Sequence, residues 1–305
     1  MDFSIVVTQM AILFAIVIVG FVCGKMNVTN QAFSKGFSNL IVNITCPALI
    51  IASTMGDNMP DRELIIPLLA IGTITYAILL VIARHLPKLL GVKTDERGLY
   101  SFMLTFGNVG FIGYPIVASI FGNEAVFYAS VLNVPNTISV FVWGTQFIIG
   151  KNGNGFPMKR LYSPAMIGTY ISILIVAFAW HAPQPMAQAF TLLGNITVPG
   201  SLLIIGYSMS QIPTKHLAGS PRLLLMAAFR LMILPLFVMQ CLRLTGLFDD
   251  LTININTIII AMPVASFGTI FCLKYGVDET VMAQGTFVTT LLSILSIPLI
   301  VSLIV

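Results

Sequence analysis

The residues of this chain that could do chemistry are amides and hydroxyls within long apolar segments. An amide donates and accepts hydrogen bonds and suits the recognition of a polar group better than acid–base catalysis. Burying an amide costs free energy unless it is hydrogen-bonded. We therefore expect these side chains either to join helices together or to contact a ligand. The residues are Asn43, Thr45, Asn108, Asn133, Asn136, Asn195, Thr197 and Ser266.

Glycines and prolines interrupt two of the apolar segments. Residues 107–115 read GNVGFIGYP, and residues 263–268 read PVASFG. Proline alone costs about 3 kcal/mol inside a helix, and unwound backbone at membrane depth is tolerated only where it packs in protein or lines a cavity. We therefore predict two broken helices whose half-helix N-termini, with free N–H groups and partial positive charge, favour an anion. The competing interpretation is that these residues only permit close helix packing.

This pattern gives a set of candidate site residues and no metal site, because the four cysteines and three histidines lack metal-ligand spacing. The predicted substrate-binding residues are Asn108, Gly110, Gly113, Pro115, Asn133, Asn136, Pro263, Ser266 and Gly268. The residues predicted to support the site are Asn43, Thr45, Pro47, Asn195, Thr197, Pro199 and Arg230.

Arg230 is the cation expected deepest within a span, eight residues past Arg222. One interpretation is that its long side chain snorkels to the membrane surface or pairs with a backbone carbonyl. The other is that it pairs with an anionic substrate or stabilises the moving part of a transporter. The sequence leaves both interpretations open.

The elements that must position these residues are membrane-spanning helices. Of the 305 residues, 57% are hydrophobic and 9% are charged, far below the roughly 25% charged residues of a soluble domain. Apolar runs recur at about the 20 residues that a helix needs to cross a bilayer. The predicted spans are 4–23, 34–55, 64–85, 97–122, 124–149, 163–181, 186–210, 221–244, 253–274 and 279–304.

An internal repeat divides the chain into two halves. Asn43-Ile44-Thr45-Cys46-Pro47 recurs as Asn195-Ile196-Thr197-Val198-Pro199, and further along Pro67 matches Pro221, and Gly122 matches Gly276. Five spans per half make the second half inverted in the membrane, as in many secondary transporters. The predicted organisation is a first repeat at 1–150, a short cytoplasmic linker at 151–162 and a second repeat at 163–305.

The loop charges predict the orientation. With alternating spans, the side that holds both termini carries only Arg62 and Arg243 among the basic loop residues. Short loops rich in Lys and Arg stay in the cytoplasm. We therefore expect a multi-pass protein of the cell membrane with both termini on the non-cytoplasmic side.

With these motifs, the sequence resembles the auxin efflux carrier family, of the short prokaryotic type, over essentially the whole chain. The motifs that carry the resemblance are GNVGF and GYP within 107–115, Ala261-Met262-Pro263, Tyr275-Gly276, Arg230-Leu231 with Pro235, and the paired Pro47 and Pro199.

The resemblance implies an all-α fold of ten transmembrane helices in two inverted five-helix repeats, related to the bile acid–sodium symporters. Helices 1, 2, 6 and 7 would form a scaffold, and helices 3–5 and 8–10 a transport domain in which helices 4 and 9 unwind and cross. Asn108 and Pro115 would match the crossover asparagine and proline. Plant members carry a second crossover proline, where this chain has Gly268 or Thr269.

The resulting hypothesis is an elevator-type carrier of a small organic anion, such as a carboxylate or an auxin-like acid, by uniport or proton coupling. The resemblance also implies a homodimer through the scaffold helices. The alternatives are sodium symport and a ligand sensor that reuses the fold. An enzyme would need a nucleophile, metal ligands or a carboxylate pair within the bilayer, and the spans offer none of these. No cofactor or nucleic-acid partner is expected.

Overall fold

The structure, a computed structural model, describes residues 3–55, 60–150, 164–211, 220–265 and 267–304. The predicted linker at 151–162 lies outside these residues. The described part of the chain is helical and contains no strand. Its α-helices are α1 (Phe3–Lys25), α2 (Gln31–Leu40), α3 (Cys46–Ala52), α4 (Ile65–Leu89), α5 (Arg97–Thr105), α6 (Tyr114–Phe121), α7 (Ala125–Leu132), α8 (Val134–Ser139), α9 (Thr145–Ile149), α10 (Pro164–Ala177), α11 (Gln184–Gly194), α12 (Thr197–Ser210), α13 (Pro221–Ala228), α14 (Leu234–Thr245), α15 (Asp250–Ile260), α16 (Phe267–Tyr275) and α17 (Thr280–Ile304).

Six helical stretches of the described residues are long and apolar enough to cross a membrane, and each overlaps a predicted span. They are Gln31–Ala52, Arg62–Leu89, Ala125–Ile149, Gln184–Tyr207, Pro221–Thr245 and Thr280–Ile304. Shorter apolar helices overlap the other predicted spans. They are Phe14–Lys25, Val109–Phe121, Pro164–Ala177 and Asp250–Ile260. The chain is therefore an all-helical membrane protein.

Prolines place π-helical turns within three of these stretches. The turns η1 (Ile41–Thr45), η3 (Val109–Gly113) and η8 (Phe229–Ile233) each end two residues before a proline, respectively Pro47, Pro115 and Pro235. A proline ring clashes with the carbonyl four residues earlier and offers no N–H. The helix relieves this by widening for one turn, so that the N–H before the proline bonds five residues back.

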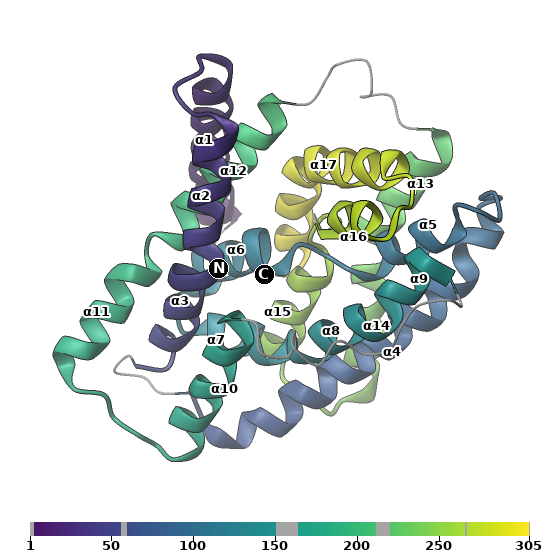
Figure 1. Ribbon diagram of the computed structural model, residues 1–305. Helices are drawn as coiled ribbons and strands as arrows, with labels where there is room; N and C mark the ends of the chain where they lie inside the picture. The colour runs from purple at the N-terminus through teal and green to yellow at the C-terminus, as the bar shows by residue number, and fades with distance from the viewer. Residues whose placement is uncertain (1–2, 56–59, 151–163, 212–219, 266, 305) are drawn as a thin grey trace.

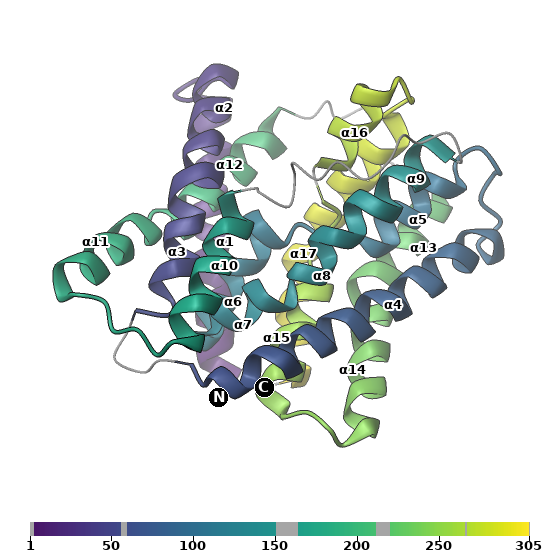
Figure 2. The same cartoon turned by 60° about the horizontal axis from the view of Figure 1, so that its bottom comes forward.

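The helices form two groups that lie on opposite sides of the molecule in both views (Figures 1 and 2). One group contains α1, α2, α3, α11 and α12. The other contains α4, α5, α9 and α13 to α17, with α6 and α7 between the groups. Helices of the first group come from both halves of the sequence, and so do those of the second.

Glycines let α1 and α12 pack with their backbones in contact. A Cβ added at Gly20 would lie 2.8 Å from the Leu203 Cα, and one at Gly24 would lie 2.9 Å from the Ser210 Cβ. From the other helix, a Cβ at Gly206 would meet the Phe21 backbone nitrogen at 2.6 Å. Within membranes, helix association depends on such close packing of small residues. The first-span pair Gly20 and Gly24 therefore serves a contact within the chain.

We predict that Gly20→Ala destabilises the protein, because the added methyl group overlaps the α12 backbone and overpacking costs about 1–3 kcal/mol. The midpoint of thermal unfolding in detergent should fall by several degrees. Gly36→Ala is the matched control, since a Cβ at this exposed helical glycine meets nothing within 4 Å. Equal midpoints for the two variants would contradict the prediction.

Candidate functional site

The backbone leaves helical geometry where α5 and α15 end, and the two segments cross there. Gly107 and Val264 form an isolated antiparallel bridge. The Asn108 N–H donates to the Pro263 carbonyl at 2.8 Å, and the Ala265 N–H donates to the Phe106 carbonyl at 3.0 Å. We call residues 106–108 and 262–265 the crossover. It joins two segments that are far apart in sequence through backbone hydrogen bonds.

Arg230 satisfies the carbonyl groups at which the two helices stop. Its Nη1 donates to the Leu104 and Thr105 carbonyls at 3.1 and 3.3 Å, and its Nε donates to the Met262 carbonyl at 3.2 Å. The side chain is fully buried. It therefore pairs with backbone carbonyls, as one sequence interpretation expected, and it does not snorkel. In the same region the Val264 N–H donates to the Thr289 hydroxyl at 3.0 Å.

Asn108 begins the helical segment that follows the crossover. Its side-chain Oδ1 accepts from the Phe111 N–H at 3.3 Å, and its carbonyl accepts from the N–H groups of Ile112 and Gly113. This is N-capping, in which a polar side chain satisfies an otherwise free N–H. The capped end carries the partial positive charge of a helix N-terminus.

A cavity of about 410 Å³, the amide cavity, lies on one side of Asn108 and Phe111. Polar groups on its wall come from the crossover and from α7 to α8. Charged side chains are not found on its described wall. The lining residues are Ile41, Val42, Cys46, Gly107, Asn108, Val109, Gly110, Phe111, Asn133, Asn136, Thr137, Val140, Ala165 and Phe271.

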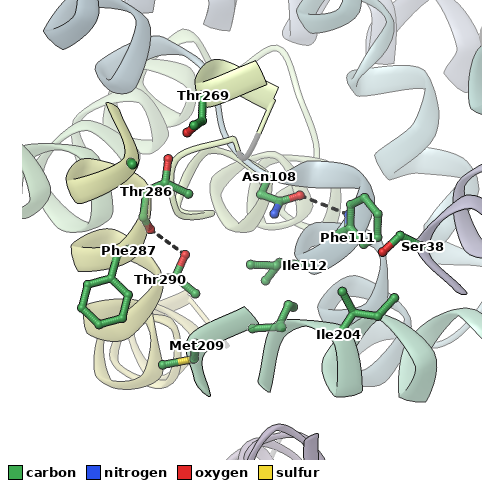
Figure 3. A pocket seen from close by; sticks show the side chains of 12 residues that line it. Ser38, Asn108, Phe111, Ile112, Ile204, Met209, Thr269, Thr286, Phe287 and Thr290 are labelled. Atoms are coloured by element: carbon green, nitrogen blue, oxygen red, sulfur yellow. Dashed lines mark hydrogen bonds between the residues drawn. The ribbon is translucent and has the colours of Figure 1, made fainter. Parts of the chain in front are cut away.

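A second cavity of about 320 Å³, the threonine cavity, also has Asn108 and Phe111 on its wall. Figure 3 shows Thr286 and Thr290 of α17 across this space from Asn108, Phe111 and Ile112. The described lining of this cavity is also free of charged groups. Its further lining residues are Ser38, Ile204, Ile205, Met209, Thr269, Ala283 and Phe287.

A chain of hydrogen bonds orients the amides of the first cavity. The Asn136 Nδ2 donates to the Asn133 Oδ1 at 2.7 Å, and the Asn133 Nδ2 donates to the Tyr114 hydroxyl at 3.1 Å. The Asn136 Oδ1 is buried without a hydrogen-bond partner among the described residues. Because hydroxyl protons and amide orientations adapt to their partners, this chain can present either a donor or an acceptor at Asn136.

The structure brings together some of the predicted substrate-binding residues and separates others. Asn108, Gly110, Asn133 and Asn136 line the amide cavity. Ser266 lies outside the described residues. The predicted residues absent from both cavity linings are Gly113, Pro115, Pro263 and Gly268.

The crossing point differs from the one that the resemblance implies. The chains cross at Gly107 and Val264, whereas Pro115 is the second residue of α6, and Gly268 lies within α16. Pro115 therefore lies inside the helical segment that begins after Asn108, just past the π-helical turn η3. Pro263 belongs to the crossover through its carbonyl, which accepts from the Asn108 N–H.

The repeated Asn-Ile-Thr-x-Pro motifs meet at their threonines. The Thr197 hydroxyl donates to the Thr45 hydroxyl at 2.9 Å, and both side chains are buried. Asn43 and Asn195 are exposed on the protein surface and are absent from both cavity linings. Asn43 donates to the Asn39 carbonyl of its own helix at 2.8 Å.

The remaining supporting residues are the two motif prolines. Pro47 packs beside Gly168 of α10, where a Cβ on the glycine would lie 3.2 Å from the Pro47 Cα. Pro199 is exposed.

The hydroxyls of the threonine cavity are not among the site residues predicted from the sequence. Thr286 and Thr290 lie four residues apart and so share a helix face. Thr290 follows Asn136 at the same offset that separates Pro67 from Pro221. Carrying the repeat through to the last span would have identified Thr290 as the counterpart of a predicted site amide.

We predict that Tyr114→Phe destabilises the protein, because the Asn133 amide loses a buried acceptor, at a cost of about 1–2 kcal/mol. Thermal unfolding in detergent measures the change. Tyr128→Phe, which removes a hydroxyl from a partly exposed tyrosine of the neighbouring α7, is the control. An unfolding midpoint as high as that of the control would show that the Asn133 bond contributes nothing.

Comparison with known proteins places this geometry in context. The family described as "Membrane transport protein" matches residues 5–156 and again residues 154–301. An uncharacterized transporter of Methanocaldococcus jannaschii is 24% identical, over 94% of this chain and 95% of that protein. A protein named "Putative malonate transporter" from Rhizobium meliloti is 18% identical, over 93% of this chain and 91% of that protein.

Proposed function

This chain belongs to the membrane transport protein family that includes the auxin efflux carriers, and we propose that it is a secondary transporter for a small organic anion. The observation that carries the proposal is the capped N-terminus at Asn108, which forms part of the wall of both cavities. Backbone N–H groups at such an end bind carboxylates. The malonate named for one relative is a small carboxylate of the same class.

We place the substrate in the amide cavity. Asn108, Asn133 and Asn136 supply several amide groups on one wall, which suits a carboxylate with further polar atoms. Phe111 and Phe271 supply an apolar surface for the rest of the molecule. A volume of about 410 Å³ falls within the usual range for small-ligand sites, roughly 300–1,000 Å³.

The proposed architecture is ten transmembrane helices in two inverted repeats. The double match to one family supports two related halves. Gly122 and Gly276, which the repeat aligns, both have positive φ and directly follow α6 and α16. The contact between Thr45 and Thr197 is what two copies of one motif related by a twofold axis would make.

The proposed movement is an elevator in which a transport domain of α4 to α9 and α13 to α17 slides against a scaffold of α1, α2, α3, α10, α11 and α12. The separation of α1, α2, α3, α11 and α12 from α4, α5, α9 and α13 to α17 in two views supports this division (Figures 1 and 2). The expected orientation has both termini on the non-cytoplasmic side of the cell membrane, since the basic loops lie on the other side. A homodimer through the scaffold helices remains an expectation from the resemblance.

We predict that Asn108→Asp abolishes carboxylate transport and leaves the fold intact. The aspartate keeps the oxygen that caps the Phe111 N–H but places a negative charge on both cavity walls. Uptake of labelled malonate and of indole-3-acetate into proteoliposomes should fall at least about tenfold, as expected for two like charges at close range.

Asn30→Asp is the matched control. Asn30 is also an N-cap, and its Oδ1 accepts from the Phe33 N–H at 2.8 Å on an exposed part of α2. This variant should transport as the parent does. Transport that survives Asn108→Asp, or that increases, would favour a cationic or neutral substrate.

Imposed ion gradients distinguish the coupling alternatives. Uniport or proton coupling predicts saturable flux that is unchanged when sodium is replaced by potassium. A requirement for a sodium gradient would favour the symporter alternative. Saturable binding of either acid without flux would favour a sensor.

A further inference from the structure

Arg230 places a full positive charge directly behind the wall of the amide cavity. Its side chain is completely buried on the π-helical turn η8 and is absent from both cavity linings. Gly107 does line the amide cavity. A Cβ on Gly107 would collide with the Arg230 Nη2 and lie 3.4 Å from its Cζ. One glycine backbone therefore separates the guanidinium from the cavity.

No acid among the described residues forms an ion pair with this guanidinium. The ion pair within the described part of the chain joins Arg243 to Asp250, and the Arg230 Nη2 has no hydrogen-bond partner among the described residues. The partners of Arg230 are carbonyls at the C-terminal ends of α5 and α15. These ends carry partial negative charge, about half an elementary charge each, and the full charge of Arg230 balances the two.

The result is a crossover with a positive electrostatic bias. Arg230 masks the two C-terminal ends, while the N-terminal end at Asn108 stays directed at the cavities. Charges interact over longer distances in a protein interior than in water, because the effective dielectric constant is lower.

We propose that Arg230 sets the preference of the amide cavity for anions by acting through the Gly107 backbone, without touching the substrate. It is a selectivity and positioning residue, and its role rests on the function proposed above. Removing the positive charge should weaken the binding of a carboxylate by about tenfold or more, which is the scale expected for a charge at this range. Binding of a neutral ligand of the same shape should change little.

The test compares Arg230→Gln with Arg230→Lys in the purified full-length protein. Both variants lose the rigid guanidinium fork, but only the lysine keeps the charge. For each variant, inhibition constants are measured for indole-3-acetate and its neutral isostere indole-3-acetamide, and likewise for malonate and malonamide. We expect the ratio of acid affinity to amide affinity to fall about tenfold in Arg230→Gln and to stay near the parent value in Arg230→Lys.

A purely structural role gives a different result, because misplacement of the crossover weakens acid and amide binding together. An unchanged ratio in Arg230→Gln, or an equal fall in both variants, would overturn the inference. If the parent protein binds neither acid, the proposed function itself is wrong.

A second pair of variants applies if Arg230→Gln does not fold. Gly107→Ala displaces the guanidinium without removing it and should lower the acid-to-amide ratio. Gly36→Ala is the control, since Gly36 is absent from both cavity linings and its Cβ would meet nothing within 4 Å. Equal ratios in the two glycine variants would contradict the proposal.

Discussion

The structure depends on satisfying the backbone where two helices stop inside the membrane. Each buried polar group left unpaired costs about 1–3 kcal/mol, and the hydrocarbon core supplies no water to compensate. At the crossover, two backbone hydrogen bonds join the two segments. The Thr289 hydroxyl accepts from a further backbone N–H, and the Arg230 guanidinium donates to the carbonyls at the helix ends. The guanidinium fork bridges both helix ends, because it reaches three carbonyls through two nitrogens.

Three prolines shape the backbone that carries Arg230 and several cavity residues. The turns η1, η3 and η8 each widen the helix before a proline, and such turns often occur at functional sites. Arg230 lies on η8, the amide-cavity residues Ile41 and Val42 lie on η1, and Val109 to Phe111 lie on η3. The prolines Pro47, Pro115 and Pro235 therefore act on the site through backbone geometry while their own side chains stay away from the cavity linings.

Local sequence signals predicted apolar helical segments and the two breaks, because hydrophobic length and helix breakers act locally. For Arg230 the sequence left carbonyl pairing open beside its alternatives. These signals did not predict that Asn43 faces outward or that Thr286 and Thr290 face a cavity. A membrane helix is apolar on its lipid face and on its protein face, so periodicity cannot identify the buried side. The partners of Arg230 were equally hidden, since Leu104 lies 126 residues away in sequence.

The position of Arg230 also bears on how a carrier can release its substrate. An arginine in the cavity wall would form a bidentate ion pair with a carboxylate, and such a pair is strong in a low dielectric medium. Transport requires binding that is favourable enough for entry and weak enough for exit. In the proposed transporter, a charge behind Gly107 would attract an anion over a distance while neutral amides make the contacts. Neutral contacts would break in the proposed sliding movement, whereas Arg230 and its carbonyl partners belong to the same helix group and would move together.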